Sequence, residues 1–166
     1  MRRRICKWAA IALAAWLVYL SADGEISPLE CALIVRRDLG FYPSGAEILY
    51  AQDTHGGPHG DGDAKLVMRL KANDRLEKRF SENPGWHPLP LPDELAGAHF
   101  AGLFQGVAGL ENGWYYFYDR NDFYHRDGKA EDRYDFTGLH DQLSYNYTAA
   151  VYDADTNILC YLAVDT

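Results

Sequence analysis

The stretch that decides the fold is the C-terminal one, Leu143–Thr166, which reads LSYNYTAAVYDADTNILCYLAVDT. Apolar and polar residues alternate through two runs, and the short polar segment DADTN, Asp153–Asn157, separates them. Alternation of this kind is typical of strands that bury one face, and two such runs around a polar turn predict a β-hairpin.

The turn of this hairpin also begins like a calcium-binding loop. Asp153, Asp155 and Asn157 have the spacing of the first three ligands of such a loop. The later positions do not fit, because Ile158 replaces the turn glycine and Val164 replaces the bidentate glutamate. We therefore interpret the segment as a hairpin turn.

Working outward from the hairpin, the sequence predicts more strands and two helices. Residues 113–120, GWYYFYDR, form an aromatic strand, and residues 46–52 and 64–72 form a second hairpin with a long glycine-rich connection. A helix begins after Ser27 and ends at Gly40, and residues 73–85, NDRLEKRFSENPG, contain another. The fold class is α+β: an N-terminal hydrophobic helix, then a mostly antiparallel sheet with one or two packed helices.

Residues 86–95, WHPLPLPDEL, alternate prolines with leucines and predict an extended, polyproline-like backbone. We interpret them as a rigid connector that presses Trp86, Leu89 and Leu91 onto the core, and a ligand for a proline-binding domain is the alternative. Residues 93–110 predict a loose helix or loop packed on the sheet, and the polar residues 121–142 predict either a long surface loop or a partly disordered segment.

The N-terminus carries an export signal. Arg2, Arg3, Arg4 and Lys7 precede an apolar run from Trp8 to Leu20. As a helix this run spans about 20 Å, which is short of the roughly 30 Å hydrocarbon core of a bilayer. We expect residues 1–22 to be an uncleaved membrane anchor, with a cleaved signal peptide as the alternative. Residues 23–166 then form a single extracytoplasmic domain, tethered at the cell membrane in the first case and secreted in the second.

Charge restricts the partners of this domain. The chain has 16 basic and 24 acidic side chains, and four of the basic ones precede the apolar run, so the exported part carries 12 against 24, a formal charge of −12. Such a domain repels nucleic acid and anionic lipid headgroups, and it gains no affinity from counterion release with either. Nucleic-acid binding is excluded, and an envelope protein or a small ligand is the expected partner.

The connection between residues 46–52 and 64–72 contains the stretch QDTHGGPHGDGD at 52–63. His55, His59, Asp61 and Asp63 offer four donors of the types that bind zinc and similar ions. Because Gly56, Gly57 and Pro58 exclude a helix, the spacing of the two histidines does not place both rings on one face. The favoured interpretation is a turn whose Asp and His side chains bond its own backbone, without a cofactor. A divalent metal ion, possibly in a hydrolytic site, is the alternative.

The aromatic strand offers a second candidate site. Alternation places Trp114, Tyr116 and Tyr118 on one face, where they can form a stacking platform for a sugar or a partner, whereas Tyr115 and Phe117 lie on the other face. Packing into the core is the competing interpretation.

The sequence has no Gly-x-Ser-x-Gly elbow and no phosphate-binding glycine loop, which leaves nucleophilic catalysis little support. Cys31 and Cys160 lie in the exported part, and whether they pair is open.

Four segments together, DTHGGPHGDG, NPGWHPLPLP, ENGWYYFYDR and YDADTNILCYLAVDT, resemble a group of small bacterial proteins with an N-terminal membrane segment. The resemblance implies an exported or membrane-tethered domain and supplies no activity. We therefore expect a membrane-tethered extracytoplasmic binding or interaction module without catalysis, and a metal-dependent site in the Asp53–Asp63 loop is the alternative.

Overall fold

The computed structural model describes residues 26–55, 61–71, 74–95, 109–121, 128, 130–136 and 142–166. The hydrophobic helix predicted within residues 1–22 lies outside these ranges. Among the described residues, no helix is long and apolar enough to span a membrane.

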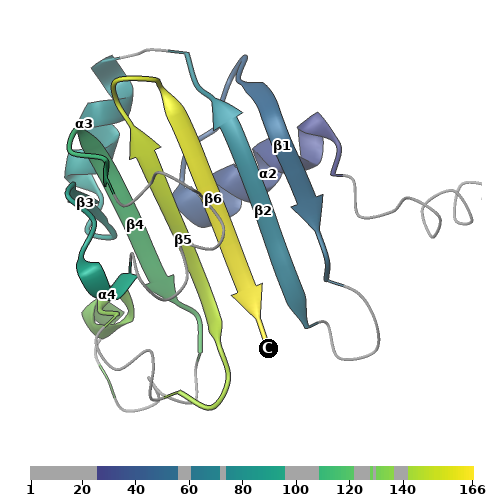
Figure 1. Cartoon of the computed structure of the whole chain (residues 1–166), viewed down its shortest axis with the longest axis vertical. Helices are drawn as coiled ribbons and strands as arrows, with labels where there is room; N and C mark the ends of the chain where they lie inside the picture. Colours follow the sequence, from purple (N-terminus) through teal and green to yellow (C-terminus); the bar gives the residue numbers. More distant parts are fainter. Residues whose placement is uncertain are drawn as a thin grey trace, which may run out of the picture.

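Six antiparallel strands form one sheet in the order β1-β2-β6-β5-β4-β3 (Figure 1). The C-terminal hairpin provides the inner strands β5 (Asn146–Asp153) and β6 (Ile158–Asp165), and it confirms the prediction from alternation. Strand β4 (Gly113–Asp119) and the short edge strand β3 (Trp86–Pro88) continue the sheet beside β5. On the other side, β2 (Gly62–Arg69) pairs with β6, and β1 (Glu47–Asp53) completes the predicted second hairpin.

Helix α2 (Pro28–Leu39) begins and ends where the sequence predicts. The Ser27 hydroxyl accepts a hydrogen bond from the Glu30 amide, the Glu30 carboxylate accepts one from the Ser27 amide, and Gly40 ends the helix in the left-handed conformation. The helix buries Cys31, Val35 and Leu39 against one face of the sheet. Figure 1 shows α2 running behind the sheet from the β1 edge toward its middle.

Helix α3 (Asp74–Glu82) covers the same face nearer to β3. Phe80 is its central anchor, because the ring contacts Trp86, Trp114 and Tyr152 with centroid separations between 4.1 and 6.4 Å. Both helices therefore lie on one face, as expected for an α+β fold. A shallow pocket of about 190 Å³ lies between the end of α2 and α3, next to Phe41, Arg79 and Trp86.

The opposite face has its own apolar cluster, over β4, β5 and β6. Leu89, Leu91 and Leu95 pack there against Phe117 and Tyr147. Trp86 lies on the helix-covered face, so the proline-rich connector passes from one face of the sheet to the other. The predicted anchoring by Trp86, Leu89 and Leu91 is confirmed, because all three are buried. Two further short elements are the single turn α4 (Asp93–Leu95) and a 3-10 helix, η3 (Ala130–Tyr134).

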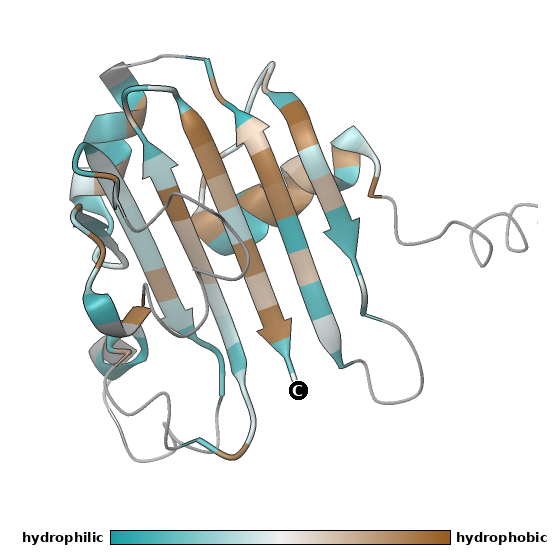
Figure 2. Cartoon of the chain, viewed as in Figure 1, coloured by the Kyte–Doolittle hydropathy of each residue, from teal (hydrophilic) through white to brown (hydrophobic). Residues whose placement is uncertain are grey.

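Hydropathy follows this arrangement. Figure 2 shows β6 hydrophobic along most of its length, with a hydrophilic residue at its C-terminal end. That residue is Asp165, which faces the helix-covered side because it follows Tyr161 and Ala163 in the alternation of the strand. A carboxylate at the end of an inner strand requires polar neighbours, and these define the candidate site.

The two cysteines of the described part lie on opposite faces of the sheet. Cys31 lies on the buried side of α2, against one face of the sheet, whereas Cys160 packs with the cluster of Leu162 and Val164 on the other face. Both are free thiols. A sheet therefore separates the two sulfurs, and the disulfide that the sequence left open does not form in this structure.

Candidate binding site: the β1 edge and the charged cluster at its end

Strand β1 is an edge of the sheet. Among the described residues, its seven residues pair on one side only, with β2. An edge strand presents unpaired backbone N–H and C=O groups to an incoming strand. Two large apolar side chains on β1 are exposed, Leu49 at 41% and Tyr50 at 47%.

A β-bulge shapes this edge. The register passes from Ile48 opposite Met68 directly to Tyr50 opposite Val67, so Leu49 is the extra residue. Because each residue inserted into a strand reverses the faces of those that follow, the bulge sets Ala51 and then Asp53 on the helix-covered face. In a regular strand that began with Ile48 on that face, Asp53 would face the other way.

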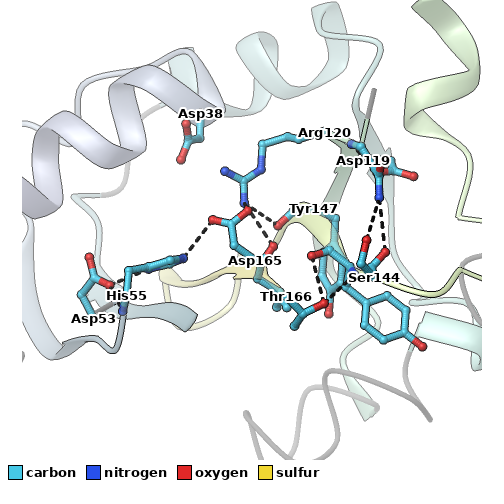
Figure 3. Close-up of polar contacts among 12 residues, drawn as sticks. Asp38, Asp53, His55, Asp119, Arg120, Ser144, Tyr147, Asp165 and Thr166 are labelled. Atoms are coloured by element: carbon cyan, nitrogen blue, oxygen red, sulfur yellow. Dashed lines mark hydrogen bonds and ion pairs between the residues drawn. The ribbon is translucent and has the colours of Figure 1, made fainter. Parts of the chain in front are cut away.

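A cluster of charged side chains, Asp53, His55, Arg120 and Asp165, closes the sheet at the C-terminal end of β1. The His55 ring lies between two carboxylates: Nδ1 is 2.6 Å from Asp53 Oδ1 and Nε2 is 2.9 Å from Asp165 Oδ2 (Figure 3). His55 thus links the edge strand β1 to the inner strand β6.

Arg120, directly after β4, completes the cluster from the other side. Its Nη2 lies 3.1 Å from Asp165 Oδ1 and within hydrogen-bonding distance of the Tyr147 and Val164 carbonyl oxygens. Asp165 therefore has a partner on each carboxylate oxygen, His55 Nε2 at Oδ2 and Arg120 Nη2 at Oδ1. The guanidinium joins the ends of β4, β5 and β6 in the same way that His55 joins β1 to β6.

Asp38 of α2 lies above this cluster (Figure 3). Its Oδ2 accepts a hydrogen bond of 2.5 Å from the buried Tyr161 hydroxyl, and both of its oxygens accept from Arg37. Burial alone would raise the pKa of Asp38, but the hydrogen bonds from Arg37 and Tyr161, together with the charges of Arg37 and Arg120, lower it below its ordinary value. Burial raises the pKa of Tyr161 well above its usual range, so this phenol is a donor and not a base.

Of the four predicted metal ligands, the structure describes His55, Asp61 and Asp63. His59 lies outside the described residues. His55 bonds to two carboxylates, and Asp63 pairs with Lys65 at 3.2 Å while its backbone bonds to Thr54. Within the described ranges no group of three or more histidine, cysteine, aspartate or glutamate side chains could hold a metal ion. The turn interpretation gains support, because Asp53 Oδ1 also accepts a hydrogen bond from the His55 amide at 2.8 Å.

The predicted aromatic platform faces the helices. Trp114, Tyr116 and Tyr118 share one face, as alternation predicts, and all three belong to the cluster under α2 and α3. Tyr116 is buried, with 6% of its surface exposed, and Trp114 and Tyr118 are partly buried. Tyr118 lies under Arg133 and beside Tyr134. These rings do not form an open stacking surface on the described part of the chain.

Sequence reasoning missed Arg120 and Asp165 as members of a cluster. Each lies at or directly after the end of a correctly predicted strand. A charged residue in that position is the signal by which the sequence could have indicated a polar cluster at the end of the sheet. Their proximity to His55 depends on the pairing of β2 with β6, which joins segments about 100 residues apart and leaves no local pattern.

No protein-family model matches the chain, and neither the curated proteins nor the solved structures include a match.

Proposed function

We propose that this chain is a membrane-tethered, extracytoplasmic module that binds a partner protein through strand β1, without catalysis. The observation that carries the proposal is the open edge of β1, with Leu49 and Tyr50 exposed on it. An extended segment of the partner would add a strand beside β1, where backbone hydrogen bonds supply affinity and the exposed side chains supply selectivity.

The charged cluster supports this role by holding β1 in place. The bonds from His55 to Asp53 and Asp165 fix the C-terminal end of the strand, and Glu47 with Arg69, 2.6 Å apart, fixes the other end. A preorganised edge spends less conformational entropy on binding than a frayed one. The exported part has a formal charge of −12, which favours a basic partner and accelerates its association at low salt.

Site-specific photocrosslinking in intact cells tests the proposal. A photoreactive amino acid replaces Tyr50 in one protein and Leu143 in another, the latter being 97% exposed and outside β1. We expect one discrete crosslinked species at position 50 and none at position 143. Leu49→Lys should abolish that species, because a lysine on an edge opposes strand addition, whereas Leu143→Lys should leave it intact. The absence of a discrete species at position 50, or its persistence in Leu49→Lys, would refute binding through β1.

The alternative of a divalent metal site at His55, His59, Asp61 and Asp63 stays a prediction, to be tested by the metal content of the purified protein. It has less support, because the His55 nitrogens already bond to two carboxylates and Arg120 brings a positive charge to the same cluster.

A further inference from the structure

The outward face of helix α2 carries two exposed leucines. Leu29 is 62% exposed and Leu33 is 49% exposed, and a spacing of four residues places them one above the other on the same face. The opposite face of the helix is the buried one, formed by Cys31, Val35 and Leu39. A single exposed leucine needs no explanation, but two stacked on the outer face of a short helix form an apolar stripe.

Basic residues continue this stripe. Arg36 follows Leu33 by three residues and is exposed, and Arg37 beside it is exposed while pairing with Asp38. The exported part has only 12 basic against 24 acidic side chains, so two adjacent arginines stand out against their surroundings. Exposed leucines beside arginines on one helix face occur in helices that lie in the membrane interface, although Glu30 and Asp38 of α2 balance the two arginines in charge.

The position of α2 in the chain places this face near a membrane. Only residues 21–27 separate the apolar run, which ends at Leu20, from the first residue of the helix at Pro28. Seven residues span at most about 25 Å when fully extended. The helix itself is about 18 Å long, since it has 12 residues. If the run is the membrane anchor, the N-terminal end of α2 lies within about 25 Å of the end of that anchor.

We infer that the stripe of Leu29, Leu33 and Arg36 docks on the outer surface of the membrane that holds the anchor. The two leucines enter the boundary between headgroups and acyl chains, and Arg36 pairs with lipid phosphates. The inference rests on the membrane tether in the proposed function and adds a second contact with the bilayer. A second copy of the chain is the competing occupant. The formal charge of −12 on the exported part opposes a second copy and anionic lipid alike, so the membrane is favoured by the tether and by the exposed leucines and Arg36 on this face.

The experiment uses the full chain with a polarity-sensitive thiol dye at Leu33→Cys. Leu143→Cys is the matched control, since it places the same dye on another exposed leucine. A Cys6→Ser background removes the N-terminal thiol, Cys31 is fully buried, and protein without the added cysteine gives the background labelling. The protein is reconstituted into phosphatidylethanolamine vesicles with and without phosphatidylglycerol, and parallel samples undergo alkaline carbonate extraction to test the anchor.

The expected result is a blue-shifted emission for the dye at position 33 in vesicles that contain phosphatidylglycerol, and none at position 143. Adding Leu29→Ser should lower the docked-to-undocked ratio about tenfold or more, because each buried leucine contributes that much. Arg36→Glu should remove the dependence on phosphatidylglycerol.

Three other results would overturn the inference. Equal emission at both positions in chain that resists carbonate extraction rejects the docking and leaves the tether intact. Release of the chain by carbonate rejects the tether, and with it the docking. A blue shift without lipid that grows with protein concentration assigns the stripe to a second copy.

Discussion

His55 Nε2 lies 2.9 Å from Asp165 Oδ2, although 110 residues separate the two along the chain. The contact joins the end of the edge strand β1 to the C-terminal end of the inner strand β6. His55 and Asp165 are each partly buried, with side chains 23% and 29% exposed. The pair therefore connects an edge strand of the sheet to one of its two central strands.

The first prediction concerns the energy of this pair. A double-mutant cycle with His55→Ala and Asp165→Ala should give a coupling of about 1 kcal/mol in the free energy of unfolding, the range for a partly exposed charged hydrogen bond. Urea unfolding of the purified chain measures it. Lys65→Ala with Asp165→Ala is the control cycle, because Lys65 pairs with Asp63 instead, and it should be additive. A coupling as small as that of the control would show that His55 does not hold β1.

A second prediction follows from the lowered pKa of Asp38. Because its pKa is lower in the folded than in the unfolded chain, its contribution to stability is complete above the unfolded value of 3.8 and is lost as the pH falls through the folded value. At neutral pH, Asp38→Asn should reduce the free energy of unfolding by about 1–2 kcal/mol. The deficit should shrink as the pH falls from about 5 toward 2.

Tyr161→Phe is the companion variant for this measurement. It removes one of the hydrogen bonds that lower the pKa of Asp38, so it should show a weaker dependence on acid than the unsubstituted protein. Stability curves for Asp38→Asn and the unsubstituted protein that run parallel from neutral to acidic pH would contradict the assignment.

The third prediction tests the close approach of β4 and β5. Gly113 has a φ of +142°, and a Cβ there would overlap the carbonyl oxygen of Tyr152. Gly113→Ala should therefore lower the free energy of unfolding by about 2–3 kcal/mol, because either the backbone or the strand pairing must shift. Gly109→Ala provides the control, since a Cβ there meets no atom within 4 Å, and it should change stability by less than about 0.5 kcal/mol. Equal effects of the two changes would argue against this geometry.

The fourth prediction concerns the thiols. Burial, with a smaller contribution from Asp153, raises the pKa of Cys160 to about 12, and burial raises that of Cys31. At mildly alkaline pH the native protein should therefore alkylate slowly at both positions and rapidly once it is unfolded. Mass spectrometry of protein alkylated without reductant should show both thiols free. A peptide pair that joins Cys31 to Cys160 would require the two faces of the sheet to meet and would contradict the fold.

Much of the architecture was predictable because it is encoded locally. Alternation predicted β5 and β6, capping residues located the ends of α2 at Ser27 and Gly40, and leucines between prolines marked a connector that packs on the core. In each case the signal lies within a few residues, where backbone preference and the burial of one face point to the same structure.

The candidate site was less predictable. The histidines and aspartates of residues 52–63 predicted a candidate site from composition alone, and His55 does belong to the charged cluster. The partners of His55 outside its own turn were not foreseeable, because Asp165 and Arg120 reach it through strand pairing that no local pattern specifies. The face of the sheet on which Asp53 lies was also not predictable, because the extra residue Leu49 moves every later residue of β1 to the opposite face.

By itself, then, the sequence determined strands β1, β2, β4, β5 and β6, helices α2 and α3, and the strongly acidic charge of residues 23–166, because these depend on residue type and near neighbours. Strand β3 was not predicted, because its residues Trp86–Pro88 were interpreted as part of a polyproline-like connector. The tertiary structure alone decided that β1 is an open edge, that Cys31 and Cys160 lie on opposite faces, and that His55 meets Asp165. The physical reason is that strand order and register follow from the burial of both sheet faces at once, which is a property of the whole core.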